Sequence, residues 1–323
     1  MIDASNRPDW PVVRPYGNAA IAEGAALIRA GQPVAVPTET VYGLAADTCD
    51  SDAVARIYAA KGRPAFNPLI VHVADLAMAE TLGVFGESER KVAAALWPGP
   101  LTLVVPRRAD GSVARLATAG LDSIAIRVPA HRAMQALIAA SGRPLAAPSA
   151  NASGGISPTR ASHVAASLAG RVALVIDDGP CAAGLESTVA RVVDGRVVVL
   201  RPGPVTVARL AEVSGLDVIA AAGDNPIVAP GQLASHYAPV KPLRLNAAQF
   251  ADDEWGIGFG ALDGDDHLSP SGDVVEAAAR LFDALHRADA SAKPKIAVAA
   301  VPDDGLGAAI NDRLQRAAAP RSA

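Results

Sequence analysis

The sequence has few cysteines and few aromatic residues, and it carries no excess of basic charge. Its two cysteines, Cys49 and Cys181, lie far apart without a CxxC pair, which argues against a disulfide scaffold and a structural zinc site. Aromatic residues make up 4% of the 323 residues, so Ala, Val, Leu and Ile must build the core. A net charge of −4 provides no general attraction to nucleic acid or anionic membrane. Any anion site must therefore be a local cluster of cations.

Targeting and membrane signals are missing as well. The opening residues, MIDASNRPDW, are polar and contain no basic segment followed by an apolar one. No apolar run is long enough to span a bilayer. Together with the unpaired cysteines, these features predict a cytoplasmic protein that has no membrane partner.

Several common catalytic motifs do not occur in the chain. The sequence contains no GxxxxGK[ST] phosphate loop, no HExxH and no GxSxG. Gly256, Gly258 and Gly260 follow a predicted strand, but their spacing is not that of GxGxxG. An enzyme with this sequence must therefore bind its substrates without the commonest signatures.

Predicted strands and helices alternate over most of the chain. Helical periodicity covers residues 18–30, 88–96, 131–140, 161–168 and 205–213, and strand patterns cover 32–37, 69–73, 101–106, 123–128, 145–147 and 172–176. Asp194 and Gly195 predict a type I′ turn between strands at 188–193 and 196–201. The alternation predicts an α/β fold with a twisted mixed sheet and helices packed on it.

The length of the chain favours two domains. Periodicity fades at 215–242, and beyond it strands near 243–245, 256–260 and 296–301 alternate with helices at 274–288 and 306–318. We therefore predict a catalytic domain at 10–214, a linker or lid at 215–242 and a smaller α/β domain at 243–320. A linker of this length is usually functional or disordered. Its Gln232, Ser235, His236 and Tyr237 favour a function.

Candidate functional residues begin in the stretch 37–73. A strand leads into the polar turn Thr38-Glu39-Thr40, and the helix after it ends at Gly62, between Lys61 and Arg63. His72 lies between apolar neighbours on the next strand. Cations in a last helical turn are ordinary because the helix dipole favours them, and a strand histidine is commonly a satisfied core residue. The chain has only five lysines, however, which favours a function for Lys61.

Further candidates lie at other strand ends. Ser123 and Arg127 share one face of a strand, where Arg127 is either an edge-strand solvent residue or a bidentate carboxylate clamp. The PSAN run at 148–151 and the glycines after it offer hydroxyls and free amides that suit phosphate, although this is also the composition of an ordinary turn. Ser187 precedes the predicted hairpin, and Arg201 ends it.

These short runs also follow one another in a distinctive order. They read PTETVYGL, KGRP, WPGPLTLV, SIAIRVPAH, PSAN, ESTV and LRPG. In this order they resemble the YrdC-like domain of threonylcarbamoyl-AMP synthases. PGQLASHYAP and GLGAAINDRLQRAA resemble the linker and the C-terminal, Rossmann-like α/β domain of the longer members. The resemblance covers nearly the whole chain, except for about the first ten residues.

The resemblance implies a reaction and its partners. L-threonine, bicarbonate or CO2, and ATP would give L-threonylcarbamoyladenylate and pyrophosphate, with Mg2+ carried by the ATP phosphates. A tRNA-modifying threonylcarbamoyl transferase would then use the product, so direct tRNA binding is not expected to be the main task. The enzyme would be a nucleotidyltransferase.

The resemblance also implies roles for particular residues. It assigns catalysis to Lys61 and Arg63. It assigns the L-threonine side to Thr40, His72, Arg127, Ala147 and Ser187, where Ala147 stands in place of a threonine found in several relatives. It assigns the ATP side to Arg63, Asn67, Ser123, Ser149, Asn151, Ser157, Arg201 and Tyr237.

The chemistry of these side chains agrees with the implied reaction. A carboxylate suits the planar guanidinium of Arg127, and a triphosphate suits Lys61, Arg63 and Arg201. A carbamate oxygen attacks the α-phosphate directly, so no covalent enzyme intermediate is needed and the lack of a nucleophile motif is expected. We expect the linker that carries Tyr237 to close over the site and exclude water.

Two other functions are compatible with a domain of this kind. The first is a module that binds double-stranded RNA. The acidic net charge argues against it, as does the lack of a strand rich in aromatic and basic residues. The second is a carbamoyl-adenylate former of the hydrogenase-maturation type. Members of that type have additional acylphosphatase-like and zinc-finger segments, which this sequence does not contain.

Overall fold

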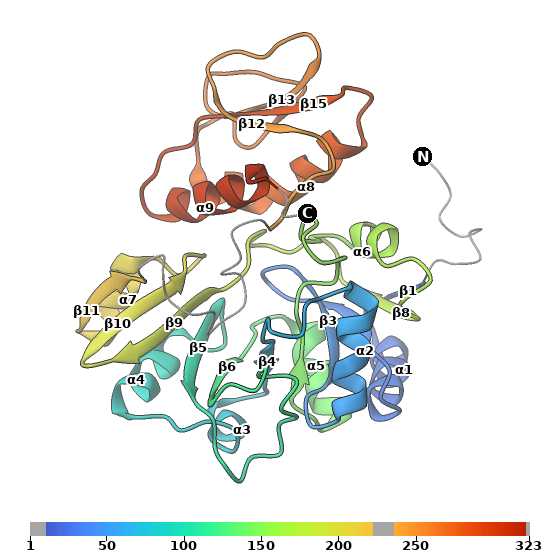
Figure 1. The fold of residues 1–323 in the computed structure, drawn as a ribbon, viewed down its shortest axis with the longest axis vertical. Coiled ribbons are helices and arrows are strands. Elements are labelled where there is room, and N and C mark those ends of the chain that lie inside the picture. Colours follow the sequence, from blue (N-terminus) through green and yellow to red (C-terminus); the bar gives the residue numbers. More distant parts are fainter. Residues whose placement is uncertain (1–10, 222–235, 321–323) are drawn as a thin grey trace.

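The computed structural model describes residues 11–221 and 236–320. A large sheet with flanking helices forms the first part, and a smaller α/β unit is stacked on it (Figure 1). Gln232 and Ser235 lie outside the described residues, as does half of the predicted linker or lid at 215–242. Within the described parts, no helix has both the length and the apolar character that crossing a membrane requires.

The first part contains a mixed sheet of eleven described strands, which confirms the predicted fold class. The strands are ordered β1-β8-β2-β3-β7-β4-β6-β5-β9-β10-β11 and pair in both parallel and antiparallel directions. Along the chain the elements are β1 (Val12–Pro15), α1 (Asn18–Arg29), β2 (Val34–Pro37), β3 (Tyr42–Asp47), α2 (Ser51–Lys61), β4 (Ile70–His72), α3 (Leu76–Glu80), α4 (Glu87–Leu96), β5 (Leu101–Pro106), β6 (Ser123–Arg127), α5 (Arg132–Ser141), β7 (Leu145–Ala146), α6 (Ala161–Ser167), β8 (Leu174–Asp177), β9 (Thr188–Val193), β10 (Arg196–Arg201), α7 (Val207–Ser214) and β11 (Asp217–Ala220).

Local sequence signals explain the elements that carry the site. The Asp50 side chain accepts hydrogen bonds from the backbone N–H groups of Asp52 and Ala53 and so caps the start of α2. Gly62 ends the helix in the left-handed conformation. Asp194 and Gly195 both have positive φ, as a type I′ turn between β9 and β10 requires.

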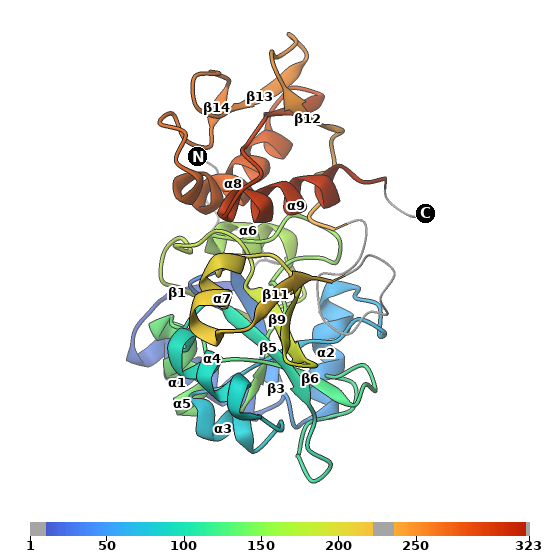
Figure 2. The ribbon, with the colours of Figure 1, turned by 90° about the vertical axis from the view of Figure 1, so that its left-hand side faces the viewer.

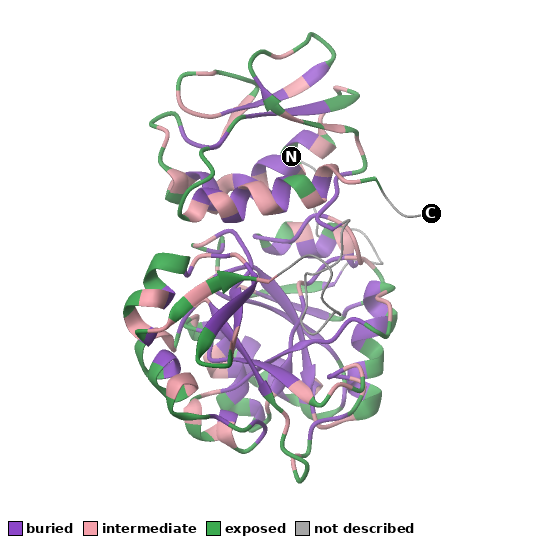
Figure 3. Cartoon of the chain, turned by 60° about the vertical axis from the view of Figure 1, so that its left-hand side comes forward, coloured by how far each residue is buried: buried purple, intermediate pink, exposed green. Residues whose placement is uncertain are grey.

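The period of two along the strands divides the core between opposite faces of the sheet. Val34 of β2 packs with α1 and α5, whereas its neighbour Ala35 belongs to the cluster that includes Ile57 of α2. Figure 3 shows the buried strands inside and the exposed surfaces of the helices outside. A third, small cluster includes Ile70 of β4 and Ala125 of β6. All of its buried members lie on strands. His72 and Arg127 lie two residues further along these strands, hence on the same face, which carries the site.

The smaller unit is a parallel four-stranded sheet with two helices, as expected for a Rossmann-like α/β domain. Its elements are β12 (Leu243–Ala247), β13 (Glu254–Gly258), β14 (Asp266–His267), α8 (Val274–Ala290), β15 (Lys295–Ala299) and α9 (Leu306–Ala318). Both helices lie between this sheet and the first part (Figures 1 and 2). One apolar cluster joins the two parts, since Val41 and Leu185 pack in it with Phe282.

The structure also contains elements that the sequence pattern did not predict. β3 is buried along its whole length, so it shows no alternation of apolar and polar residues. β1 and β11 are exposed edge strands of four residues each, and α3 has only five residues. The range 215–242, predicted as a linker, therefore begins with a strand that pairs with β10.

Candidate active site

A pocket lies where β4, β6 and β10 end, beside the turn that follows β2. Of the residues predicted for the site, it is lined by Thr40, Arg63, His72, Arg127, Ala147, Ser149, Ser187, Arg201 and Tyr237. These residues are far apart in the sequence. The fold therefore gathers three guanidinium groups and several hydroxyls in one hollow.

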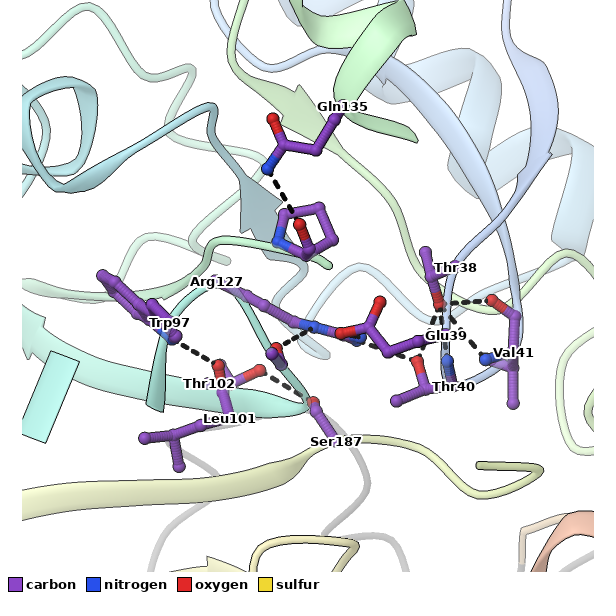
Figure 4. Close-up of polar contacts among 12 residues, drawn as sticks. Thr38, Glu39, Thr40, Val41, Trp97, Leu101, Thr102, Arg127, Gln135 and Ser187 are labelled. Carbon is purple, nitrogen blue, oxygen red and sulfur yellow. Dashed lines mark hydrogen bonds and ion pairs between the residues drawn. The ribbon is translucent and has the colours of Figure 1, made fainter. Parts of the chain in front are cut away.

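Arg127 is fixed on one side of the pocket by three partners (Figure 4). Its Nη1 donates to Thr40 Oγ1 at 2.9 Å, and its Nε donates to the Gly99 carbonyl at 3.2 Å. Its Nη2 lies 2.6 Å from Glu39 Oε1. Burial opposes ionisation of Glu39, but the charge of Arg127 holds the pKa of this carboxyl below its usual value. The guanidinium is thus held by three contacts at the place where Arg127 lines the pocket.

His72 is a neutral imidazole beside this guanidinium. Burial and the charge of Arg127 lower its pKa to about 3. Its Nδ1 is buried and has no hydrogen-bond partner among the described residues. A neutral ring with a free polar atom can bind a ligand group without adding charge.

Arg201 and Arg63 also line the pocket. Arg201 donates from Nε and Nη2 to the Ser187 carbonyl, at 3.1 and 2.9 Å. Arg63 donates from Nε to the Asn67 carbonyl at 3.1 Å and from Nη2 to the Pro68 carbonyl at 2.9 Å. Burial lowers the pKa of Arg63 to about 10, so the group still carries its charge at neutral pH.

Lys61 lies beneath the PSAN loop and is not part of the pocket lining. Its Nζ donates to the carbonyls of Ser149 and Asn151, at 2.5 and 2.6 Å. The side chain is buried, and this burial, with Arg63 and Arg171 nearby, holds the pKa of the ammonium well below its usual value. Lys61 therefore fixes the loop that presents Ser149.

Four other predicted residues do not line the pocket. The Asn151 amide donates to Ala152 and Gly155 carbonyls within its own turn. Ser157 bonds through its hydroxyl to Glu186, which does line the pocket. The Asn67 side chain is buried and has no hydrogen-bond partner among the described residues. Ser123 lies at the opposite end of β6 from Arg127.

Sequence reasoning missed two carboxylates and an arginine of the site. Glu39 and Glu186 fall within the runs PTETVYGL and ESTV, but nothing in those runs shows that their side chains are buried against arginines. Arg313 had a signal, because it falls on the apolar stripe of α9 with Ile310 and Leu314. A charge at such a position is either paired or functional.

Comparisons with known proteins agree with this architecture. The family described as telomere recombination (Sua5/YciO/YrdC) matches residues 26–203, and the family described as threonylcarbamoyl-AMP synthase, C-terminal domain, matches residues 205–319. A threonylcarbamoyl-AMP synthase of Bacillus subtilis is 42% identical over an alignment of 324 residues, gaps included. The alignment covers 93% of this chain and 93% of the relative. The chain belongs to the threonylcarbamoyl-AMP synthase family.

Other members of this family are similar over the full length of the chain. The threonylcarbamoyl-AMP synthase of Pyrococcus abyssi is 40% identical over 319 residues, covering 92% of this chain and 93% of the relative. The crystal structure of P. abyssi Sua5 complexed with L-threonine superposes with a TM-score of 0.85 at 37% identity, covering 96% of this chain and 97% of that one. The family and two-domain form inferred from the sequence are therefore confirmed.

Proposed function

We propose that this chain makes L-threonylcarbamoyladenylate and pyrophosphate from L-threonine, bicarbonate or CO2, and ATP. One observation carries the proposal: the fixed guanidinium of Arg127 shares a single pocket with Arg63 and Arg201. An amino acid carboxylate and a triphosphate are two anions that need separate cationic partners a short distance apart. Family membership and the L-threonine complex of the P. abyssi relative support the same substrates.

The contacts of each cation suggest which substrate it binds. Arg127 would bind the threonine carboxylate, with Thr40 and neutral His72 beside the amino acid. Arg63 and Arg201 would bind the triphosphate, with the Ser149 loop as a source of further donors. Tyr237 also lines the pocket, and its buried hydroxyl, which has no hydrogen-bond partner among the described residues, could bond to a ligand group.

The reaction itself requires positioning more than chemistry by the protein. The threonine amine forms a C–N bond with CO2 and loses a proton, which gives a carbamate. With bicarbonate as the donor, a C–O bond also breaks, and the hydroxide leaves with that proton as water. A carbamate oxygen then bonds to the α-phosphorus while the bond to the β-phosphate oxygen breaks and pyrophosphate leaves with the electron pair. Preorganised Arg63 and Arg201 stabilise the charge that develops, and the loss of one such donor typically costs about 2.7–4 kcal/mol.

Magnesium would enter this pocket with the nucleotide. Among the residues that the structure describes, no cluster of three or more His, Cys, Asp or Glu side chains could hold a metal ion. Both carboxylates nearby, Glu39 and Glu186, are already paired with arginines. We therefore propose that Mg2+ is coordinated chiefly by ATP phosphate oxygens, where it neutralises part of the triphosphate charge.

We propose the same downstream step that the resemblance implies. The mixed anhydride product is reactive, so a tRNA-modifying threonylcarbamoyl transferase in the cytoplasm would use it. Direct binding of duplex RNA by the pocket is disfavoured because Arg63, Arg127 and Arg201 are largely buried, where a duplex backbone cannot reach them.

The test is release of pyrophosphate from ATP and Mg2+, with mass spectrometry to detect the adenylate. We expect release only when L-threonine and bicarbonate are both present, and we expect Arg127→Ala to abolish it. Arg132→Ala is a matched control, since Arg132 is an exposed arginine of α5 that pairs with Asp178. Pyrophosphate release that does not depend on threonine would contradict the proposal.

A further inference from the structure

A negative charge lies where the proposed function places the triphosphate. Glu186 lines the pocket and is 6% exposed. One of its oxygens accepts a hydrogen bond from the Ser157 hydroxyl, and the other accepts from Arg313 Nε at 2.8 Å. An unpaired carboxylate here would repel phosphate. Its partner therefore determines whether this side of the pocket can bind an anion.

That partner comes from the second domain. Arg313 lies on α9 and has 0% exposure, although it is among the largest side chains of the protein. Its Nη2 donates to the Pro202 carbonyl at 2.9 Å, and its Nη1 lies 2.5 Å from Asp312. The guanidinium carbon also lies 5.3 Å from the centre of the Tyr237 ring. Arg313 thus joins α9 to the end of β10 and to Tyr237, which lines the pocket.

The charges around Arg313 show what its removal would do. Arg313 is the cation that forms an ion pair with Glu186, and its other partner, Asp312, is shared with Arg316. Burial opposes ionisation of Glu186, but Arg313 and, more weakly, Arg201 keep its pKa below the usual value. Without Arg313, Glu186 would draw on Arg201, which now donates to Ser187. Arg201, which we expect to bind phosphate, would then pair with the Glu186 carboxylate instead.

A second contact from the same domain reaches the same loop. His286 of α8 has its Nε2 3.1 Å from the Ser157 carbonyl. The second domain therefore holds both polar groups of Ser157, the carbonyl directly and the hydroxyl through Glu186. Two helices of one domain converge on one residue beside the pocket of the other.

We infer that Arg313 is a positioning residue for ATP, which neutralises Glu186 so that Arg201 remains available to the triphosphate. This inference rests on the proposed function, since it assumes that ATP binds on this side. It gives the second domain a specific part in nucleotide binding, beyond its packing against the first. Loss of the Arg313 charge should then weaken ATP binding only while Glu186 keeps its own charge.

The test is calorimetric titration of the full chain with ATP and Mg2+, with L-threonine titrated separately. We expect Arg313→Gln to weaken ATP binding at least about tenfold, because it leaves a buried carboxylate uncompensated, and to change threonine binding less than about twofold. Glu186→Gln should bind ATP at least as tightly as the wild type. The double variant, Glu186→Gln with Arg313→Gln, should regain wild-type ATP affinity within about threefold, because the charge is balanced again.

Arg160→Gln provides the matched control. Arg160 also joins the two domains, through Asp283 of α8 at 2.9 Å, but Asp283, unlike Glu186, does not line the pocket. We expect this variant to bind ATP like the wild type. Equal weakening by Arg160→Gln would show that domain packing alone is responsible and would overturn the inference.

The remaining outcomes are also decisive. A double variant that folds but binds ATP about ten times more weakly than the wild type overturns the inference, even if Arg313→Gln alone fails to fold. The proposed function has a separate criterion, the dependence of pyrophosphate release on threonine. If the wild-type chain binds ATP but releases pyrophosphate without threonine, the proposed function is wrong. The ATP titrations would still show whether Arg313 affects nucleotide binding.

Discussion

At the scale of single residues, the cations of the pocket are fixed before any ligand arrives. Arg127, Arg63 and Arg201 each donate to backbone carbonyls at 2.9 to 3.2 Å. Such bonds keep the guanidinium groups in place at little further entropic cost when the ligand binds. The same bonds mean that a substitution changes both charge and geometry.

Arg127→Lys should raise the KM for L-threonine about 10- to 100-fold, since an ammonium cannot reproduce the three directed contacts of the guanidinium. Steady-state kinetics with each substrate varied in turn would measure this effect. The KM for ATP should stay nearly constant. A larger change in the ATP requirement would show that Arg127 lies on the nucleotide side, and Arg132→Lys should change neither constant.

Lys61→Ala should lower both stability and turnover. It leaves the Ser149 and Asn151 carbonyls buried without their donor, which costs about 1–3 kcal/mol. Lys91→Ala is the matched control, because Lys91 also donates to a carbonyl, that of Ser214, away from the pocket. Both variants should be compared by thermal midpoint and by turnover at a temperature where each is folded. Full turnover of folded Lys61→Ala would contradict a role in holding the loop.

His72 should make the protein less stable in acid. Its folded-state pKa is about 3, below the usual 6.5, so between these values the unfolded chain binds a proton that the folded chain does not. Stability is therefore fully present above pH 6.5 and falls by about 1.4 kcal/mol per pH unit below it. His72→Gln should remove this part of the slope in denaturant titrations at pH 7, 6 and 5. An unchanged slope would contradict a buried neutral His72.

At the scale of elements, the turn after β10 is packed against the start of β9. A Cβ atom added at Gly203 would lie 2.5 Å from the Thr188 backbone nitrogen and 2.7 Å from the Glu186 carbonyl. Glycine at this position thus allows the LRPG turn to support Glu186 and Ser187 from behind. Gly203, the last residue of the LRPG motif, therefore has a role in packing and not in catalysis.

Gly203→Ala should therefore displace the start of β9 and cost about 1–3 kcal/mol of stability, as overpacking typically does. Turnover should fall as well, because Ser187 and Glu186 move with the strand. Gly17→Ala tests the specificity of the effect, since a Cβ at Gly17 meets nothing within 4 Å. A Gly203→Ala variant as stable and active as Gly17→Ala would contradict this packing.

Elements with strong local signals could be predicted from the sequence, and elements defined by tertiary contacts could not. Asp50 and Gly62 delimit α2, and Asp194-Gly195 fixes the hairpin, because each signal is a backbone requirement of adjacent residues. β3 and β11 gave no pattern, the first because it is buried throughout and the second because it is an exposed edge.

The site was predictable to a similar extent and for a similar reason. Motif order identifies the residues that reach the pocket, such as Arg127 and Arg201. It does not show that Lys61 turns beneath the loop, because direction depends on what packs around the helix end. The pairing of Glu186 with Arg313 joins positions 127 residues apart and becomes visible only when the two domains are in place.

At the scale of the whole molecule, the two domains form one functional unit around the pocket. α8 and α9 lie against the first domain (Figure 2). Tyr237 lines the pocket, and Arg313 reaches Glu186. A net charge of −4 and buried cations suit a small anionic ligand better than a long polyanion.

The most direct measurement is a crystal structure of the full chain with L-threonine and a non-hydrolysable ATP analogue. The proposed arrangement predicts the threonine carboxylate within hydrogen-bond distance of Arg127 and the triphosphate between Arg63 and Arg201, with the amine directed toward the α-phosphate. Threonine bound away from Arg127, or a triphosphate that touches neither Arg63 nor Arg201, would contradict it.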